Sequence, residues 1–323
     1  MGALTSPFLC PNADADPTLA ILFAGQGAQH PGMGAEMAEA EEAARVVYEA
    51  ADAARPGTSA QCFHADADEL KVTANTQPCV FATDLACAAA LSAHGVRPGC
   101  VAGFSLGELA ALTYAGVFET GDGFAVVAER ARLMEAACEA QPGAMAAVLK
   151  LAPERVEELA RQVGDCWPVN YNSPQQTVVA GRPEAIAALQ AAAREAGGRV
   201  MPLAVSGAFH SPLMASASEA LLPYLRGVRT QAPCVDVWSN TLAAPYPDDP
   251  AQIAALLARQ ASSPVRWTDT LAGMAARGVT TFVEVGPGHV LTGLVRRTLP
   301  DALALSVETP GQLADALTAI AAR

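Results

Sequence analysis

Basic residues are scarce in this chain of 323 residues, and lysine is the scarcest of them. The sequence holds 20 Lys and Arg against 33 Asp and Glu, which gives a formal net charge of −13 at pH 7. Lys71 and Lys150 are its only lysines. Proteins that bind nucleic acid or anionic membranes usually carry the opposite balance, with basic residues gathered on one face. The composition therefore gives no support for a nucleic-acid or membrane partner.

Long apolar runs are also lacking, because Thr83 and Asp84 interrupt the Ala-rich stretch from Val80 to Ala93. We therefore expect no membrane-spanning helix. The first residues lack the basic segment and the apolar core that a secretory signal requires. We interpret residues 1–16 as a flexible tail and expect a cytoplasmic protein.

No Cys-x-x-Cys pair occurs among the eight cysteines, most of which lie in apolar segments. Cysteines paired at that spacing are typical of zinc sites and redox centres. We therefore expect buried free thiols in a reducing compartment, with no metal site and no disulfides.

What the chain does have is the composition of a globular α/β protein, with 51% hydrophobic and 16% charged residues. Its length suits one large domain or a domain with an insertion. Strand-like runs alternate with helical patterns, which indicates a parallel sheet covered by helices. The expected strands are 19–23, 100–102, 235–238 and 281–285, and the expected helices are 36–54, 83–93, 123–139, 249–259 and 269–277.

Between residues 142 and 208 the pattern changes to strand, helix, strand, strand, helix, strand. This order is typical of the ferredoxin-like fold. We predict a ferredoxin-like subdomain over 142–208, inserted into a large α/β domain made of 17–141 and 209–323. The segments of the insert are 144–149, 153–163, 168–171, 177–180, 183–196 and 199–205.

A glycine-rich loop, from Gly25 to Gln29, follows the first expected strand. A dinucleotide-binding fingerprint starting at Gly25 needs glycine or alanine at position 30, where the chain has His30. No Lys-Ser/Thr pair follows to complete a phosphate-binding P-loop. A nucleotide cofactor is therefore poorly supported. Two interpretations stay open, an ordinary turn and a loop that offers a backbone N–H to a reacting oxygen.

Ser105 is the strongest candidate for a reactive residue. It lies in Gly-Phe-Ser-Leu-Gly-Glu, between a short apolar run that ends at Ala102 and residues from Leu106 onward that follow helical spacing. A serine at a sharp turn from strand to helix, flanked by glycines, is typical of a nucleophile elbow. The N–H groups at the start of the helix would favour negative charge on a substrate oxygen above the serine.

A serine nucleophile needs a base, and the chain has five histidines: His30, His64, His94, His210 and His289. His210 directly follows the expected insert, so it can face the cleft between the two parts. His64 and His94 lie in polar or loop-like segments, and His289, in a Gly-Pro-Gly-His loop, is a rival. We favour His210, and no aspartate stands out as the group that orients its ring.

Nine segments together resemble one family. They are FAGQGAQ (23–29), TANTQP (73–78), GFSLGE (103–108), ERARLM (129–134), GAMAAV (143–148), NSPQQTVVAG (172–181), VSGAFHSPLM (205–214), ARQASSPVRW (258–267) and EVGPGHVLTGLVRR (284–297). Their order and spacing are similar to those of the malonyl-CoA:acyl-carrier-protein transacylases of fatty-acid synthesis and the related polyketide synthase acyltransferase domains. The resemblance covers nearly the whole chain after the tail. It implies an α/β-hydrolase-like parallel-sheet domain with a ferredoxin-like insert subdomain.

The resemblance also implies a role for each matching residue. Ser105 matches the nucleophile and His210 matches its base. The backbone N–H groups of Gln26 and Leu106 match the oxyanion hole. In this family a backbone carbonyl, rather than a carboxylate, orients the base, and that carbonyl maps here to Gln260. The absence of a candidate aspartate is then expected.

Arg130, in ERARLM, matches the arginine that holds the free carboxylate of the malonyl group. Its planar fork can bind a carboxylate through two hydrogen bonds, which a lysine cannot reproduce. Phe104 stands where the family often has histidine, while Ala24 and Ala131 replace a usual proline and glycine. We expect Phe104 and Phe209 to line the substrate pocket. The Ala-Phe-His motif that contains Phe209 is similar to the malonyl-type version.

The implied reaction moves a malonyl group from malonyl-CoA to the phosphopantetheine thiol of acyl carrier protein through a malonyl-serine ester. Such ping-pong chemistry needs no cofactor and no metal. The nearest alternative is a trans-acting polyketide synthase acyltransferase. A serine thioesterase or esterase would release the acyl group to water and would not need Arg130. The intact set of matching residues speaks against a non-catalytic scaffold.

Acyl carrier proteins are typically acidic, and this chain is acidic as well. Docking would therefore need a local basic patch near the cleft. The insert and the final helix offer candidates, which are Lys150, Arg194, Arg199, Arg296 and Arg297. An ordinary solvated surface is the competing interpretation for each of them.

Overall fold

A six-stranded, mostly parallel sheet forms the centre of the protein. The structure is a computed structural model that describes residues 14–205 and 207–323. Within these residues the sheet has the order β10-β9-β1-β2-β7-β8, and every neighbouring pair is parallel except β7 with β8. Its strands are β1 (Asp16–Phe23), β2 (Pro98–Gly103), β7 (Asp236–Ser239), β8 (Ala244–Pro245), β9 (Thr281–Val285) and β10 (Leu303–Val307).

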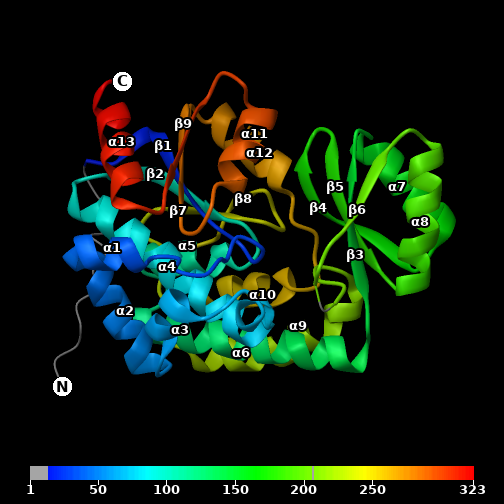
Figure 1. Cartoon of the computed structure of the whole chain (residues 1–323), viewed down its shortest axis with the longest axis horizontal. Coiled ribbons are helices and arrows are strands. Elements are labelled where there is room, and N and C mark those ends of the chain that lie inside the picture. The colour runs from blue at the N-terminus through cyan, green and yellow to red at the C-terminus, as the bar shows by residue number, and fades with distance from the viewer. Residues whose placement is uncertain (1–13, 206) are drawn as a thin grey trace.

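Helices cover both faces of this sheet (Figure 1). Successive side chains of a strand point to opposite faces. In β1, Ile21 packs into the core that contains α4, whereas Leu22 packs into the core that contains α11 and α12. The helices of this part are α1 (Ala35–Ala40), α2 (Glu42–Ala54), α3 (Thr58–His64), η1 (Glu69–Lys71), α4 (Thr73–Ala93), α5 (Gly107–Tyr114), α6 (Thr120–Ala140), η2 (Pro212–Met214), α9 (Ala215–Gly227), α10 (Pro250–Gln260), α11 (Trp267–Ala276), α12 (Val290–Thr298) and α13 (Pro310–Ala321).

A second, antiparallel sheet stands at one end of the molecule, on the right in Figure 1. Its order is β4-β5-β3-β6, and its strands and helices follow one another as strand, helix, strand, strand, helix, strand. This is the ferredoxin-like arrangement. The predicted fold class is confirmed. The elements are β3 (Ala144–Leu149), α7 (Pro153–Val163), β4 (Cys166–Ser173), β5 (Gln176–Gly181), α8 (Pro183–Glu195) and β6 (Arg199–Pro202).

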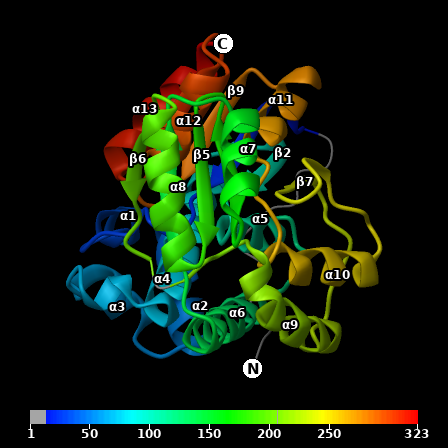
Figure 2. The same ribbon diagram turned by 90° about the vertical axis from the view of Figure 1, so that its right-hand side faces the viewer.

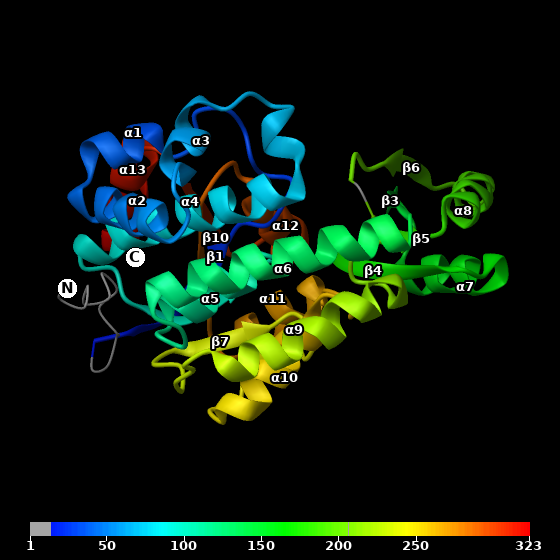
Figure 3. The same cartoon turned by 90° about the horizontal axis from the view of Figure 1, so that it is seen from below.

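The long helix α6 joins the two parts. It runs beneath the large sheet and reaches the small one (Figure 3). Met134 and Cys138, near its end, pack with Met145 and Val178 on one face of the small sheet. Helices α7 and α8 cover the other face (Figure 2). The small sheet is therefore fixed against the edge of the large part by apolar contacts.

The predicted domain boundaries, at 17–141, 142–208 and 209–323, stay a prediction. The predicted tail lies outside the described residues as far as residue 13. Asp16 already belongs to β1 and pairs with Pro98.

Several predicted elements need correction. The helix expected over 36–54 is two helices, because Glu41 between them has an extended backbone. Helix α4 begins at Thr73, well before the predicted start. It is buried on nearly all sides, so no amphipathic pattern marks its first turns. Strand β10 and helix α13 were not predicted, and Arg296 and Arg297 therefore lie on α12 rather than on the final helix.

Six of the described cysteines are buried free thiols: Cys62, Cys79, Cys87, Cys100, Cys138 and Cys166. Cys234 is disulfide-bonded, so the expectation of free thiols is wrong for that residue. Spacing along a sequence does not reveal such a pairing. None of the helices in 14–205 and 207–323 combines the length and the apolar character that crossing a membrane requires.

Candidate active site

Ser105 lies at the sharp turn between β2 and α5. Its backbone is in the left-handed region, with φ 53°, which is strained for a residue other than glycine. A Cβ on Gly103 would lie 1.9 Å from the backbone of Gly107, and a Cβ on Gly107 would lie 2.3 Å from the carbonyl oxygen of Phe23. Both glycines are therefore needed for the helix to start this close to the sheet. The turn places Ser105 in the wall of a pocket.

Asn240, a buried residue directly after β7, fixes the strained turn. Its Oδ1 accepts from the backbone N–H of Ser105 at 2.7 Å, and its Nδ2 donates to the carbonyl oxygen of Gly103 at 2.7 Å. These two bonds hold the residues before and at the turn together. Asn240 was not among the residues predicted from the sequence. The only signal for it was its place after a strand, next to β2 in the sheet.

His210 lies against the serine, with 2.7 Å between its Nε2 and the Oγ of Ser105. Its Nδ1 faces the carbonyl oxygens of Gln260 and Ser263, at 3.0 and 3.1 Å. A carbonyl oxygen only accepts, so the neutral ring carries its proton on Nδ1. Nε2 is then free to accept from the serine hydroxyl. The contact with Ser263 had not been expected from the sequence.

Burial has the largest effect on the pKa of His210, a residue that is 3% exposed. Burial and the nearby charge of Arg130 lower the pKa of His210 to about 4, and the two backbone carbonyls oppose this shift. The imidazole is therefore neutral at pH 7. That is the protonation state a general base needs.

The guanidinium of Arg130 is 1% exposed and lies beside the serine. Its Nη2 is 3.4 Å from the Oγ of Ser105 and donates to Oε1 of Gln260 at 3.0 Å, while Nη1 donates to Oε1 of Gln77 at 2.8 Å. Burial lowers the pKa of Arg130 to about 10, so it remains charged at pH 7. Its Nε is buried without a partner among the described residues. Gln77, within TANTQP, had not been assigned a role from the sequence.

The backbone N–H groups of Gln26 and Leu106, close to Ser105, have no hydrogen-bond acceptor in the described part of the chain. Leu106 is fully buried, and Gln26 lines the pocket. The next amide along the helix, that of Gly107, instead donates to the carbonyl oxygen of Phe104 at 3.0 Å. Buried N–H groups are rarely left unpaired in native proteins. The two amides are therefore open to an oxygen acceptor on a ligand.

Phe104 and Phe209 both line the pocket. The ring of Phe104 packs edge-on against Trp267, with 5.3 Å between the ring centroids. The insert contributes the opposite wall. Its lining residues are Met145, Ala147, Asn170, Asn172, Gln176, Val178, Leu203 and Val205.

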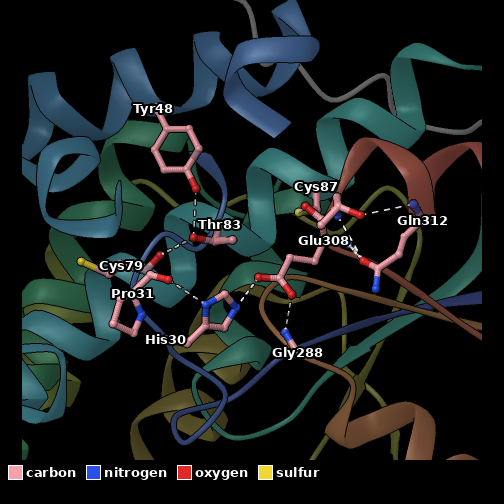
Figure 4. A network of polar contacts seen from close by, with 10 residues as sticks. His30, Pro31, Tyr48, Cys79, Thr83, Cys87, Gly288, Glu308 and Gln312 are labelled. Atoms are coloured by element: carbon pink, nitrogen blue, oxygen red, sulfur yellow. Dashed lines mark hydrogen bonds and ion pairs between the residues drawn. The ribbon is translucent and has the colours of Figure 1, made fainter. Parts of the chain in front are cut away.

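The loop that carries Gln26 is tied to the far edge of the sheet. Figure 4 shows His30, at the end of that loop, pointing toward Glu308, which follows β10. Nε2 of His30 lies 2.5 Å from Oε1 of Glu308, and Oε2 of Glu308 accepts from the N–H of Gly288 at 2.9 Å. One carboxylate therefore links two loops that lead into the pocket.

The other histidines do not approach the serine. His289, the rival candidate, is exposed at the start of α12 and does not line the pocket. His64 is exposed on α3, and His94 lies 3.2 Å from the carboxylate of Glu41. Of the five histidines, the structure brings only His210 to Ser105.

Known proteins resemble this chain along most of its length. The acyl transferase domain family matches residues 21–313. The malonyl CoA-acyl carrier protein transacylase of Bacillus subtilis is 36% identical over 298 residues, which cover 90% of this chain and 94% of that protein.

Solved structures agree with these sequence matches. A crystal structure of malonyl-CoA:acyl carrier protein transacylase from Xanthomonas oryzae has a TM-score of 0.91 at 36% identity, covering 94% of this chain and 99% of that one. A type II polyketide synthase acyl-carrier protein in complex with its malonyl-transacylase gives a TM-score of 0.89 at 34% identity, covering 93% and 99%. The chain belongs to the acyl transferase family, among the malonyl-CoA:acyl carrier protein transacylases.

Proposed function

We propose that this protein transfers the malonyl group of malonyl-CoA to the phosphopantetheine thiol of acyl carrier protein, through a malonyl ester on Ser105. Fatty-acid biosynthesis in the cytoplasm is the proposed setting. The observation that carries the proposal is the meeting of Ser105, His210 and Arg130 in one pocket. A nucleophile, its base and a cation for a carboxylate are the three groups that this substrate requires.

In the first half-reaction, Nε2 of His210 takes the proton of Ser105 as Oγ attacks the thioester carbonyl. The new oxyanion accepts from the N–H groups of Gln26 and Leu106, which have no other acceptor among the described residues. When the tetrahedral intermediate breaks down, His210 returns the proton to the sulfur of CoA. The carbon–sulfur bond breaks and a malonyl-serine ester remains.

In the second half-reaction, the phosphopantetheine thiol of the carrier protein enters the emptied site. His210 accepts the thiol proton while the sulfur attacks the ester carbonyl, and the same two amides bind the oxyanion. Oγ of Ser105 leaves and regains its proton from the imidazolium. Each half-reaction exchanges one acyl bond for another, so the mechanism requires no redox cofactor, nucleotide or metal.

Arg130 gives the pocket its preference for a substrate with a free carboxylate. Its guanidinium is buried and close to the serine, and its Nε has no partner among the described residues. A malonyl carboxylate would pair with it. The pairing would also reduce the repulsion between Arg130 and the imidazolium that forms on His210, because Arg130 is one of the groups that lower the pKa of that ring. Substrate binding would then favour the proton transfer that follows it.

For the carrier protein we retain the five basic residues as docking candidates. All five are exposed, and they are Lys150, Arg194, Arg199, Arg296 and Arg297. None of them is among the described residues that line the pocket. They would therefore act on the carrier's surface and not on the acyl group.

Intact-mass measurement after incubation with malonyl-, acetyl- and methylmalonyl-CoA tests the proposal. We expect a malonyl adduct that disappears when holo acyl carrier protein is added, with the malonyl mass reappearing on the carrier. Rapid loss of the adduct to water, at a rate that the carrier does not change, would instead identify a thioesterase.

A further inference from the structure

Glu108 is a buried carboxylate at the start of α5 that the mechanism above does not use. It is 0% exposed. Its Oε1 accepts from the hydroxyl of Tyr246, and its Oε2 accepts from the backbone N–H of Asn240 at 2.8 Å and from Nε2 of Gln260 at 3.3 Å. Two of these neighbours are N–H donors, and the third is a hydroxyl that can donate. The surroundings therefore suit an ionised carboxylate, which only accepts.

The side chain of Gln260 lies between Glu108 and the catalytic groups. Its Nε2 also donates to the carbonyl oxygen of Ser105 at 2.6 Å, and its Oε1 accepts from Nη2 of Arg130 at 3.0 Å. An amide donates at one end and accepts at the other. An ionised Glu108 fixes the donating end of Gln260 on its own side and so leaves the accepting end facing Arg130.

The backbone of Gln260 has a second task, because its carbonyl oxygen accepts from Nδ1 of His210 at 3.0 Å. Gln260 therefore contacts His210 through its main chain and Arg130 through its side chain. A rotation of the Gln260 amide would put two sets of donors, its NH₂ and the guanidinium, against each other. It would also remove the bond to the carbonyl oxygen of Ser105 at the elbow.

Charge balance points to the same carboxylate. Arg130 makes no direct contact with a carboxylate within the described residues, and Glu108 is the group whose charge raises the pKa of Arg130. The titratable or charged groups that act on Glu108 among those residues are Tyr246, after β8, and Arg130, on α6. Burial raises the pKa of Glu108 to about 7, and bonds from Tyr246, Asn240 and Gln260 oppose that rise.

We propose that ionised Glu108 is a positioning residue that acts through Gln260 to hold Arg130 and His210 in their working arrangement. The inference rests on the proposed transferase function. A protonated Glu108 carries a hydroxyl that donates, so it no longer dictates which end of the Gln260 amide faces it. Acylation of Ser105 by malonyl-CoA would therefore require Glu108 to be ionised.

The test is single-turnover acylation by malonyl-CoA, followed by intact mass across the pH range. The wild-type rate should rise with pH through a midpoint near the pKa of Glu108, about 7, well above the pKa of about 4 for His210. In Glu108→Gln that midpoint should vanish, and the rate at high pH should fall by about 10- to 100-fold as the amide of Gln260 loses its fixed orientation.

Tyr246→Phe provides a second variant, which retains the buried ring and removes one donor to the carboxylate. A donor to the ionised form lowers the pKa of an acid, so the midpoint in Tyr246→Phe should move to higher pH. Glu129→Gln is the matched control. It removes a carboxylate next to Arg130 in sequence that instead pairs with the exposed Arg132, and the midpoint should stay at its wild-type value.

A midpoint in Glu108→Gln or in Tyr246→Phe equal to that of the wild type would overturn the inference. A uniform loss of rate at every pH is what a merely structural role predicts, and it would also overturn the inference. If Glu108→Gln does not fold, as judged by circular dichroism, the direction of the Tyr246→Phe shift decides. A wild-type protein that forms no malonyl ester at any pH would refute the proposed function, which is a separate result.

Discussion

The two walls of the pocket differ in chemical character. The wall from the large domain contains Ser105, His210 and Arg130, which are joined to one another and to Gln260 by contacts of 2.6 to 3.4 Å. The wall from the insert has no charged residue among its described lining residues, which are apolar side chains and three amides. In the proposed mechanism, residues of the large domain make and break bonds, whereas residues of the insert shape the cavity.

The difference also has a structural origin. Ser105 lies between the end of β2 and the start of α5 in a parallel sheet, where tight turns and helix N-termini present N–H groups to a ligand. The insert offers the face of an antiparallel sheet, whose side chains alternate between its two sides. Met145 and Ala147 therefore face the pocket and α6, while Val148 packs under α7 and α8.

The largest expected effect comes from removing the proposed nucleophile, Ser105, or its proposed base, His210. Ser105→Ala should form no malonyl adduct, and His210→Ala should slow acylation by about 10⁴-fold or more, as for loss of a catalytic triad member. Stopped-flow or quenched acylation rates, with thermal unfolding as the control for folding, measure both effects. An adduct of full stoichiometry on Ser105→Ala would place the nucleophile elsewhere.

Arg130→Ala should give the next largest effect and should change selectivity. Removing the guanidinium leaves the malonyl carboxylate desolvated without a partner, at a cost of about 2 to 5 kcal/mol, or roughly 30- to 5,000-fold in kcat/KM. Acetyl-CoA does not use that contact and should lose much less. Arg130→Lys is the matched variant, and it should restore only part of the malonyl rate. Equal losses for malonyl and acetyl would make Arg130 a structural residue.

A smaller effect is expected from a substitution that loosens the loop carrying Gln26. Glu308→Gln weakens the tie between His30 and the N–H of Gly288, so the loop that carries Gln26 should lose order. We expect kcat to fall by about 10-fold with KM little changed, because an oxyanion donor acts mainly in the transition state. Asp301→Asn, an exposed substitution near β10, is the control. A change confined to KM would contradict this role for the loop.

The smallest expected effect concerns the outer surface. Charge reversal of Lys150, Arg194 and Arg199 on the insert should raise KM for acyl carrier protein by about 2- to 5-fold, and more at low salt than at moderate salt. The rate with a small pantetheine thiol should stay the same. The pair Arg296 and Arg297 on α12 provides the comparison from the large domain. The docking proposal would be contradicted if neither set of charge reversals had an effect. It would also be contradicted if the KM for acyl carrier protein fell as the salt concentration rose.

Much of this arrangement could be predicted from sequence where a motif dictates backbone geometry. The glycines around Ser105 predicted the strained turn, and the place of His210 after the insert predicted that it faces the cleft. Asn240 and the link through Glu108 could not be predicted in this way. Those contacts join residues more than 100 positions apart in the chain, through side chains that carry no local pattern.

Buried elements were also hard to predict. Helix α4 is buried on nearly all sides, so periodicity gives no sign of where it begins. Over 36–54 the error was different. A continuous helical pattern predicted one helix, although the backbone is extended at Glu41 and two helices form. Helices α1 and α2 contact each other across the break at Glu41, and a local pattern does not record such a contact.

The measurement that tests the account most directly is the fate of the acyl group on Ser105. The protein is mixed with malonyl-CoA, quenched, digested and mapped by mass spectrometry, and a parallel sample receives holo acyl carrier protein before the quench. We expect a malonyl ester on the Ser105 peptide, and we expect its transfer to the carrier to be faster than its hydrolysis. A modified residue other than Ser105, or an ester that the carrier does not discharge, would contradict it.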